Sequence, residues 1–526
     1  MIIPALLVSE PTSGQEVEFA IMSRETTLAV PSIAEARRHY DSLGEFDFVV
    51  PGGGHGAAAV SRALLERGFT VAAVANPIDE GGHSARIRWD LYRHLGYWPI
   101  IPGDTMNLLG GGLADPAIYL VTNSRLPKDL GDLTAGEVFG QAVDEAIAAS
   151  PEASEALEEF KRFMAGIGAA AQEELIATGL ASLPGASLQN VLHAAVMVHA
   201  GAYRKGLRAI DEGAYLCGSY LLERAMGGMP RGLVIPMSFD KVTLVTEHAG
   251  GRKVVGGINR VLLAKGDGPN GLEYGDMVPN SMLPKAPEEA AEQEASKLSG
   301  AKVVDWHSAE VEHGPLGEPF NNDWVFKEVR RYAPRMNPFL GEIMRRLRKG
   351  GGVVIPPGNA HESTYTFFLL SGLWEELQAA RRRGVRVTLV CNPHNLLLTA
   401  GYTVADYLRS IEQAATFALG GRKVKAEEMI DRVVVNDPST ASEKAQRMMR
   451  GEGIPSVVKQ ELLHRTPCGS VTVTPEEVRD LEARGLEVVH RPMLEVQTVS
   501  IRGIETEAVS YEKEKLLEAV LAPGVR

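Results

Sequence analysis

The chain alternates between short apolar runs and segments in which apolar residues recur at helical spacing. Residues 46–50 (FDFVV) form an apolar run closed by Pro51 and glycines, which is typical of a buried strand. Residues 57–67 are rich in helix formers and end at Gly68, where a helix C-cap is expected. A second apolar run occupies residues 69–75. The three segments predict a βαβ unit of about 30 residues, with parallel strands and a right-handed crossover.

Further apolar runs of strand length recur along the chain, several of them after a helical pattern. They lie at residues 118–121, 233–236, 353–356, 385–391, 432–436 and 486–490. This alternation predicts an α/β fold with a doubly wound, mainly parallel, Rossmann-like sheet. Helical spacing at residues 152–180, continuing at 191–203, predicts helical insertions into that fold.

A chain of 526 residues predicts two to four compact units. We expect an N-terminal extension (1–45), a core (46–458) and a C-terminal α/β extension (459–526). The core should contain a helical insert at about 135–205. It should also contain a mobile acidic insertion at about 265–300, because that stretch carries GDGPNG, several prolines and EEAAEQEAS.

Charge and composition narrow the class of partner. The net charge of −13, from 67 acidic and 54 basic residues, repels phosphate backbones and anionic lipid. No stretch approaches the roughly 18 apolar residues of a membrane helix, and the start lacks a basic segment before its apolar run. The three cysteines lie far apart without CxxC spacing, which argues against a zinc ribbon or a disulfide framework and fits a protein of the reducing cytosol. We therefore expect a folded cytoplasmic protein that binds neither nucleic acid nor membrane.

A glycine-rich turn follows the first predicted strand. Gly54, Gly56 and Ala59 fit the pattern G-x-G-x-x-[GA] between a strand and a helix. Glycines let a ligand approach the backbone, and free N–H groups at a helix N-terminus attract phosphate. We therefore expect a phosphate-bearing ligand. It could be a dinucleotide, because Asp79 lies just past the second predicted strand, where an acidic residue would bind a ribose. The alternative is a tight strand-to-helix turn without a ligand, in which His55 is an incidental polar residue.

The loop after the second predicted strand adds charged groups to this picture. Residues 79–88 (DEGGHSARIR) combine two acids, two glycines, a hydroxyl and two arginines, and residues 102–107 (PGDTMN) follow. Arginines can neutralise phosphate oxygens, while carboxylates can hold a divalent cation or orient a hydroxyl. This mixture suits a pyrophosphate site.

Together these motifs resemble the 2-phospho-L-lactate transferase family and its nucleotide-sugar-binding relatives, the CofD-like and YvcK-like proteins. The family has GGGTG where this chain has GGGHG, DDGGSSGRLR where it has DEGGHSARIR, and PGDIRN where it has PGDTMN. Similar segments follow in the family's order at residues 189–192, 231–257, 356–363, 391–392 and 431–436. The resemblance spans about residues 46–458 and identifies that region as a Rossmann-like nucleotide-binding core.

The chain also departs from the family pattern. Glu80 replaces an aspartate, His55 the loop threonine, Met106 an arginine, and Gly257 an acid. After Asn392 the sequence PHNLLLTAGYT lacks the family's glutamate. A changed ligand or a changed reaction therefore stays open.

The resemblance implies that a phosphorylated three-carbon acid passes from a nucleoside diphosphate to a hydroxyl acceptor with Mg²⁺. Such chemistry needs positioning and charge neutralisation and no protein nucleophile. The resemblance implies that Asp79 and Glu80 bind the metal. It also implies that Asp79, Glu80 and Asp104 take part in catalysis, and we expect Asp104 on a turn over the nucleotide. The ligand-binding residues that it implies are Gly53, Gly54, His55, Gly56, Arg86, Arg88, Asn107, Asn190, Asn359, Ser363 and Asn392.

Several of these residues also have a plain structural interpretation. Asp79 and Glu80 could lie in a solvated loop or cap a helix N-terminus. Arg86 and Arg88 could form ion pairs at the surface. Arg86 and Arg88 alternate about Ile87, so we expect one of them to point inward. His361, His394 and His55 could form a cluster that binds a metal or acts in acid/base chemistry; otherwise they are polar loop residues.

Two other functions stay open at this stage. The first is a non-catalytic regulator of carbon and cell-wall metabolism that binds a nucleotide sugar such as UDP-N-acetylglucosamine. The second is an NAD(P)-dependent oxidoreductase, which only the glycine pattern supports. In each case the partner is a nucleotide-linked small molecule. The resemblance further implies a homodimer.

Overall fold

The computed structural model defines the arrangement of most of the chain. It describes residues 3–4, 29–76, 87, 91, 94–96, 99, 102–122, 137, 144, 154–177, 188–207, 209–240, 243–248, 252–255, 303–313, 326–396, 399, 401–452, 467, 469–501 and 504–521.

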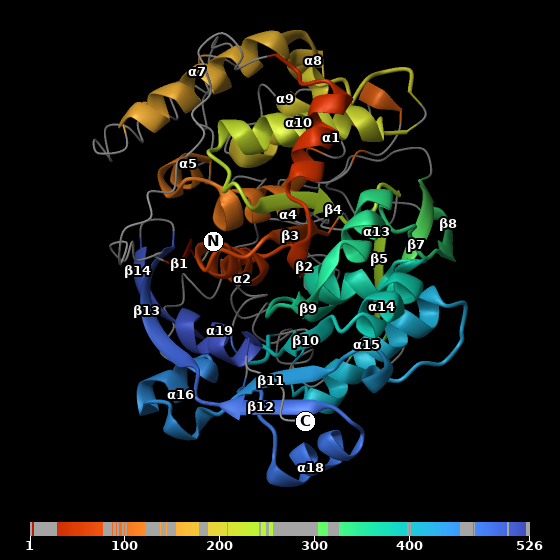
Figure 1. The fold of residues 1–526 in the computed structure, drawn as a ribbon, viewed down its shortest axis with the longest axis vertical. Helices are drawn as coiled ribbons and strands as arrows, with labels where there is room; N and C mark the ends of the chain where they lie inside the picture. Colours follow the sequence, from red (N-terminus) through yellow and green to blue (C-terminus); the bar gives the residue numbers. More distant parts are fainter. Residues whose placement is uncertain are drawn as a thin grey trace, which may run out of the picture.

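The centre of the molecule is a sheet of seven parallel strands (Figure 1). Their order across the sheet is β12 (Glu487–Arg491), β11 (Arg432–Asn436), β10 (Arg386–Val390), β9 (Leu347–Ile355), β2 (Phe46–Gly52), β3 (Val71–Ala75) and β4 (Gly232–Pro236). The chain runs from β2 through β3 to β4, then returns to β9 on the other side of β2 and continues outward to β12. The strand order therefore reverses between β2 and β9, which is the topological switch point of a doubly wound sheet.

The sequence of the inner strands explains why they lie in the middle of the protein. Every residue of the inner strands β2, β3 and β11 is buried, and so is every residue of the edge strand β4. Strands that are covered on both faces carry near-continuous apolar runs instead of an alternating pattern. VAAVA in β3 and VVV in β11 are such runs.

Helices cover both faces of the sheet and bury two separate apolar clusters. One cluster lies under α2 (His55–Glu66), α4 (Pro102–Leu108), the π-helix η1 (Leu109–Leu113), α5 (Pro116–Thr122), α7 (Ser154–Ala170), α8 (Gln172–Ala177), α9 (Leu188–His199) and α19 (Lys513–Leu521). The other lies under α1 (Ile33–Ser42), α13 (Pro338–Arg345), η6 (Tyr365–Leu369), α14 (Leu373–Arg382), α15 (Val404–Ala418), η8 (Ala426–Glu428) and α18 (Pro475–Ala483). Helix α10 (Glu212–Ala225) contributes to both.

Two smaller sheets accompany the central one. Strands β5 (Thr243–His248), β6 (Arg252–Val255), β7 (Val303–His313) and β8 (Phe326–Arg331) form an antiparallel sheet in the order β6-β5-β7-β8. Strand β1 (Ile3–Pro4) pairs with β13 (Leu494–Ile501), which forms a hairpin with β14 (Ile504–Tyr511). The two ends of the chain therefore meet in one sheet. The short helices η9 (Pro438–Thr440) and α16 (Glu443–Met449) follow β11.

The C-terminal segment is fastened to the core at several points. Helix α19 packs on α2, and ion pairs join Arg67 to Glu514 and Lys513 to Glu66. The fully buried guanidinium of Arg432 donates to the carbonyl of Val520 at 2.8 Å, near the end of α19. Strand β12, which lies within the predicted C-terminal extension, is the edge strand of the central sheet.

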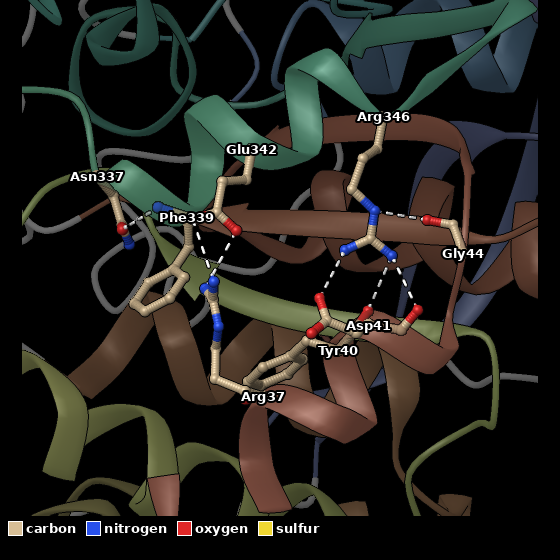
Figure 2. Close-up of polar contacts among 8 residues, drawn as sticks. All are labelled: Arg37, Tyr40, Asp41, Gly44, Asn337, Phe339, Glu342 and Arg346. Atoms are coloured by element: carbon tan, nitrogen blue, oxygen red, sulfur yellow. Dashed lines mark hydrogen bonds and ion pairs between the residues drawn. The ribbon is translucent and has the colours of Figure 1, made fainter. Parts of the chain in front are cut away.

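Helix α1 is fastened to α13 by charged groups (Figure 2). Arg37 of α1 donates to Glu342 at 3.1 Å. Arg346, after the end of α13, donates to the carbonyls of Gly44 at 2.7 Å and of Tyr40 at 3.1 Å. The N-terminus of α1 is closed by a capping box between Ser32 and Glu35. The helix of the N-terminal extension is thus part of the folded core.

The predicted α/β fold with a doubly wound parallel sheet is confirmed. The predicted strand at 118–121 is wrong: this segment is helix α5, which begins at Pro116 and is capped by the carboxylate of Asp115 on the amide of Ala117 at 2.8 Å. The predicted turn at 102–107 is also wrong, because these residues form α4. The insertion at 265–300 lies outside the described residues. No helix in the described part is long and apolar enough to cross a membrane.

Candidate functional site

The glycine turn joins β2 to α2 at the carboxyl edge of the sheet, beside the switch point. Gly52 has a φ of 141°, a conformation that residues with a side chain rarely adopt. Gly54 is the N-cap of α2 and has extended backbone angles (φ −92°, ψ −176°). It makes no side-chain cap, and the first turn of α2 carries no acidic residue. Neither Gly54 nor an acidic residue of the first turn therefore supplies a side-chain acceptor to this helix N-terminus, whose positive end favours anions.

Two glycines of the turn are required by close packing. A Cβ atom on Gly53 would overlap the carboxyl group of Asp104. A Cβ atom on Gly56 would overlap the backbone carbonyl of Pro357, in the loop after β9. The turn therefore lies directly against α4 on one side and against the loop after β9 on the other.

Gly54 differs from its two neighbours in the turn. A Cβ atom there would meet nothing within 4 Å, and its φ suits any residue. Packing within the described residues therefore does not require a glycine at this position. A glycine here keeps the approach to the N-terminus of α2 open, as a backbone phosphate site needs.

Asp104 brings negative charge to this turn. It lies in the first turn of α4, and its side chain is only 5% exposed. Its neighbour Met106, which replaces the family arginine, is fully buried in the core beneath α4. The structure thus places α4 against the glycine turn through Asp104.

The loops after β9 and β10 are joined at the same edge of the sheet. The side chain of Asn392, after β10, accepts from the amide of Gly358 at 2.6 Å and donates to the carbonyl of Gly358 at 2.7 Å. Gly358 follows Pro357, which packs on Gly56. Asn392, predicted to bind the ligand, therefore also holds the loop that packs on the glycine turn.

The next two predicted ligand residues lie on that loop. Asn359 is the N-cap of a one-turn π-helix, η5 (Ala360–Thr364), and its carbonyl accepts from the amide of Ser363 at 3.0 Å. Both side chains are half-buried. Single π-turns are often found at functional sites.

The predicted residues on α4 and α9 lie against each other. Asn190 of α9 is 5% exposed, and the neighbouring Gln189 donates through its amide to Asn107 at 3.3 Å. Gln189 was not among the predicted site residues, although it directly precedes Asn190. Asp79, Glu80, Arg86 and Arg88 lie outside the described residues.

The histidines near the site contact tyrosine hydroxyls or have a pKa that burial lowers. His361 lies 3.0 Å from the hydroxyl of Tyr402, and His193 lies 3.2 Å from that of Tyr215. Burial lowers the pKa of His193 to about 3, and that of His394 to about 4. Among the described residues, no three His, Cys, Asp or Glu side chains are grouped to hold a metal ion. His55, His361 and His394 therefore do not form such a group among the described residues.

Cys391 precedes Asn392 and is not a reactive thiol. Its side chain is 1% exposed, and burial raises its pKa to about 12. A cysteine nucleophile needs a lowered pKa and an exposed sulfur, so the sequence-based interpretation of Cys391 as a small apolar side chain is confirmed. Its carbonyl accepts from the hydroxyl of Tyr511 at 2.5 Å, which ties the C-terminal hairpin to the loop after β10.

Comparisons with known proteins can be set beside this geometry. Neither a protein-family model nor a curated protein matches the chain. A crystal structure of protein BH3568 from Bacillus halodurans matches with 17% sequence identity and a TM-score of 0.50, covering 91% of this chain and 99% of that one. The two proteins share a fold.

A second crystal structure of BH3568 matches over the same shares of both chains, with 17% identity and a TM-score of 0.49. Its description names BH3568 a member of the UPF0052 family. At 17% identity this likeness is one of fold.

Proposed function

We propose that the chain is a cytoplasmic member of the 2-phospho-L-lactate transferase family that binds a nucleoside diphosphate at the switch point between β2 and β9. The motif resemblance supports the family. The fold shared with BH3568 is consistent with it, because UPF0052 is the family of CofD-like and YvcK-like proteins. The proposed partner is a nucleotide-linked small molecule, bound by a homodimer.

One observation carries the proposal. The glycine turn starts α2 at the point where the strand order reverses, its N-cap residue Gly54 provides no side-chain cap, and Gly54 leaves the approach to the turn open. Ligands of open α/β sheets bind in the crevice outside the carboxyl ends of the strands at such a point. Backbone amides and the positive end of the helix dipole suit a diphosphate there.

The donor chemistry near the turn fits a magnesium ion. Mg²⁺ in nucleotide sites is usually bound by one or two carboxylates together with the phosphates. The carboxylate of Asp104 is buried directly against Gly53, beside the proposed phosphate position. Asp104, together with Asp79 and Glu80, would hold the ion, which when bound neutralises the phosphate oxygens.

In the proposed reaction a hydroxyl of the acceptor attacks the phosphorus nearest the three-carbon acid. The new bond is between the acceptor oxygen and phosphorus, and the bond from that phosphorus to the nucleotide oxygen breaks, so that a nucleoside monophosphate leaves with this oxygen. The proton of the acceptor hydroxyl passes to solvent. The protein orients both molecules: amides of α2 hold the diphosphate, while Asn359 and Ser363 meet the nucleotide from the loop after β9. Arg86 and Arg88 are proposed to neutralise the developing charge.

The alternative is a regulator that binds a nucleotide sugar and leaves it intact. The sequences DEGGHSARIR and PGDTMN lie closer to the regulator branch of the family than to the transferases. His55, Met106 and Gly257 depart from the pattern of both branches and favour neither. Both functions use the same diphosphate site, so they differ in turnover and not in location.

Thermal unfolding with a panel of ligands tests the proposal. The panel contains GDP, UDP, UDP-N-acetylglucosamine, NAD and NADP, each with and without Mg²⁺. A ligand of the folded state adds about 2.7 kcal/mol of stability at 100 times its Kd. A Mg²⁺-dependent shift with a nucleoside diphosphate supports the transferase.

The other outcomes of the panel are equally definite. A shift confined to the nucleotide sugar, which is then recovered intact, supports the regulator. A shift with NAD or NADP alone supports an oxidoreductase, and no shift with any diphosphate overturns the proposed site.

A further inference from the structure

An open cavity at the protein surface lies between α1 and α10. Its volume is about 360 Å³. Helix α1 contributes Glu35, Arg38 and His39 to its walls, and α10 contributes Tyr220 and Arg224. Only residues 43–45 separate α1 from the start of β2, whereas the glycine turn follows the end of that strand. The two places therefore lie at opposite ends of β2.

Positive charge converges on this cavity. The pKa of Glu35 is lowered, first by hydrogen bonds from Ser32 and further by the charges of Arg38 and Arg224. The two guanidinium groups therefore act on the same carboxylate although they come from different helices. Glu35 is itself engaged at the helix cap, where Oε2 accepts from the amide and the hydroxyl of Ser32, both at 2.7 Å.

These two arginines differ from their neighbours in having no carboxylate partner of their own. Arg37, next to Arg38, pairs with Glu342, and Arg345 pairs with Glu376. Across the described part of the chain, neither Arg38 nor Arg224 has a carboxylate oxygen within 4.0 Å. Arg224 instead lies over the ring of Tyr220, 5.6 Å from its centroid. The two cations share one carboxylate in the cavity wall, that of Glu35, so an excess of positive charge remains to attract an anion.

The walls of the cavity are already in place. Helix α1 is held by α13 through Arg37 and by Arg346 (Figure 2). The rings of His39 and Tyr220 stack at 4.5 Å with an interplanar angle of 23°. The helices that carry the two arginines are therefore already in place, and a ligand has to order only the exposed arginine side chains.

We propose that this α1–α10 cavity binds a small phosphate-bearing anion between the guanidinium groups of Arg38 and Arg224. Guanidinium forks match the oxygens of phosphate and form charge-assisted hydrogen bonds with them. The last turns of α1 and α10 border the cavity, and helix C-termini favour cations over anions. Both arginines are therefore needed, and a dianion binds better than a monoanion.

Calorimetric titration with inorganic pyrophosphate tests this site in the full-length protein. The variants are Arg38→Gln, Arg224→Gln and the double variant, and the matched control is Arg382→Gln, which changes an exposed arginine in the last turn of α14. We expect each single variant to weaken one binding event at least fivefold and the double variant to lose it, with Arg382→Gln unchanged. Equal melting temperatures confirm that the variants fold.

Two further measurements separate this site from the glycine turn and define the anion. Hydrogen exchange should slow at residues 33–42 and 212–225 when pyrophosphate is added, also in a Gly54→Asp variant that blocks the turn. Unchanged exchange there, or loss of all pyrophosphate binding in Gly54→Asp, overturns the proposal. Equally tight binding of succinate overturns the preference for phosphate.

Discussion

The glycine turn and the α1–α10 cavity are two places in one protein where we propose that an anion binds, and they are built in different ways. The turn consists of backbone: it has no side-chain cap, and Gly54 has open space where a Cβ would stand. The cavity consists of side chains, with Arg38 and Arg224 supplying its charge. The glycine turn would bind an anion through backbone amides, whereas the α1–α10 cavity would bind one through arginine side chains.

This difference determines what each place can tolerate. Backbone amides are fixed by the helix, so the turn should be sensitive to the volume and charge of residue 54 and hardly sensitive to changes elsewhere on the surface. Exposed guanidinium groups act through charge that salt screens, so binding in the cavity should weaken as ionic strength rises. The following predictions test this contrast.

The largest effect is expected from Gly54→Asp. An aspartate is a good N-cap residue, and its carboxylate would accept from the first amides of α2. The free energy of unfolding should stay equal or rise by up to about 1 kcal/mol. Affinity for a nucleoside diphosphate should fall by a factor of about 1,000, because the carboxylate of the introduced aspartate occupies the phosphate position and repels the diphosphate.

The neutral variant Gly54→Asn is the matched control for that charge. It should weaken binding by a smaller factor than Gly54→Asp, as seen by titration calorimetry. A diphosphate that binds Gly54→Asp as tightly as the unmodified protein would show that the turn is only a connection between strand and helix.

The next effect concerns the pH dependence of stability and Glu223, a buried acid that directly precedes Arg224 of the α1–α10 cavity. Glu223 of α10 is 4% exposed, and burial raises its pKa to about 8, although the amide of Val234 donates to it at 2.9 Å. Since the folded-state pKa lies above the unfolded value of about 4.5, the stabilising contribution is complete below pH 4.5 and is lost as the pH rises through 8.

The Glu223→Gln variant removes this titration and keeps the acceptor for Val234. The unmodified protein should lose up to about 3 kcal/mol between pH 5 and 8 relative to Glu223→Gln. Denaturant unfolding of both proteins across this range measures the difference. Parallel curves would show that Glu223 is ionised in the folded protein throughout.

A smaller loss is expected from Gly56→Ala. Alanine is favoured over glycine in a helix by about 1 kcal/mol, yet here its Cβ would overlap the carbonyl of Pro357. We expect the variant to be destabilised by about 1–3 kcal/mol. Denaturant midpoints give the value, and a stabilised variant would mean that the turn does not lie against the loop after β9.

The smallest of these effects is expected from Asn392→Asp. The aspartate can still accept from the amide of Gly358, but it faces the carbonyl of Gly358 without a proton to donate. The cost should be about 1–2 kcal/mol of stability. Nucleotide affinity should fall about tenfold because the loop on Gly56 is loosened. Stability and affinity measured together separate this positioning role from direct contact with the ligand.

The sequence predicted those parts of the fold that depend on neighbouring residues. The strand, turn and helix from Phe46 to Glu66 were recognised because apolar runs, glycines and helix formers follow one another locally. The error at residues 118–121 has a local cause as well. Ile118 and its neighbours are apolar like a strand, but Asp115 and Pro116 form a helix start that was overlooked.

The candidate site was predictable as a set of motifs, but its contacts were not. Nothing near Gly53 in the sequence shows that it faces Asp104, because the two residues meet only after α4 packs on the turn. The bond between Asn392 and Gly358 likewise depends on the alignment of β9 with β10. The cavity between α1 and α10 was missed since α1 lies in an extension to which no motif points.

The most direct test of the central claim is titration calorimetry of the protein and of Gly54→Asp with GDP and UDP in the presence of Mg²⁺. The claim predicts that at least one nucleoside diphosphate binds the unmodified protein and that Gly54→Asp, equally stable, binds it about 1,000-fold more weakly. Equal binding by both proteins, or no binding by the unmodified one, would contradict it.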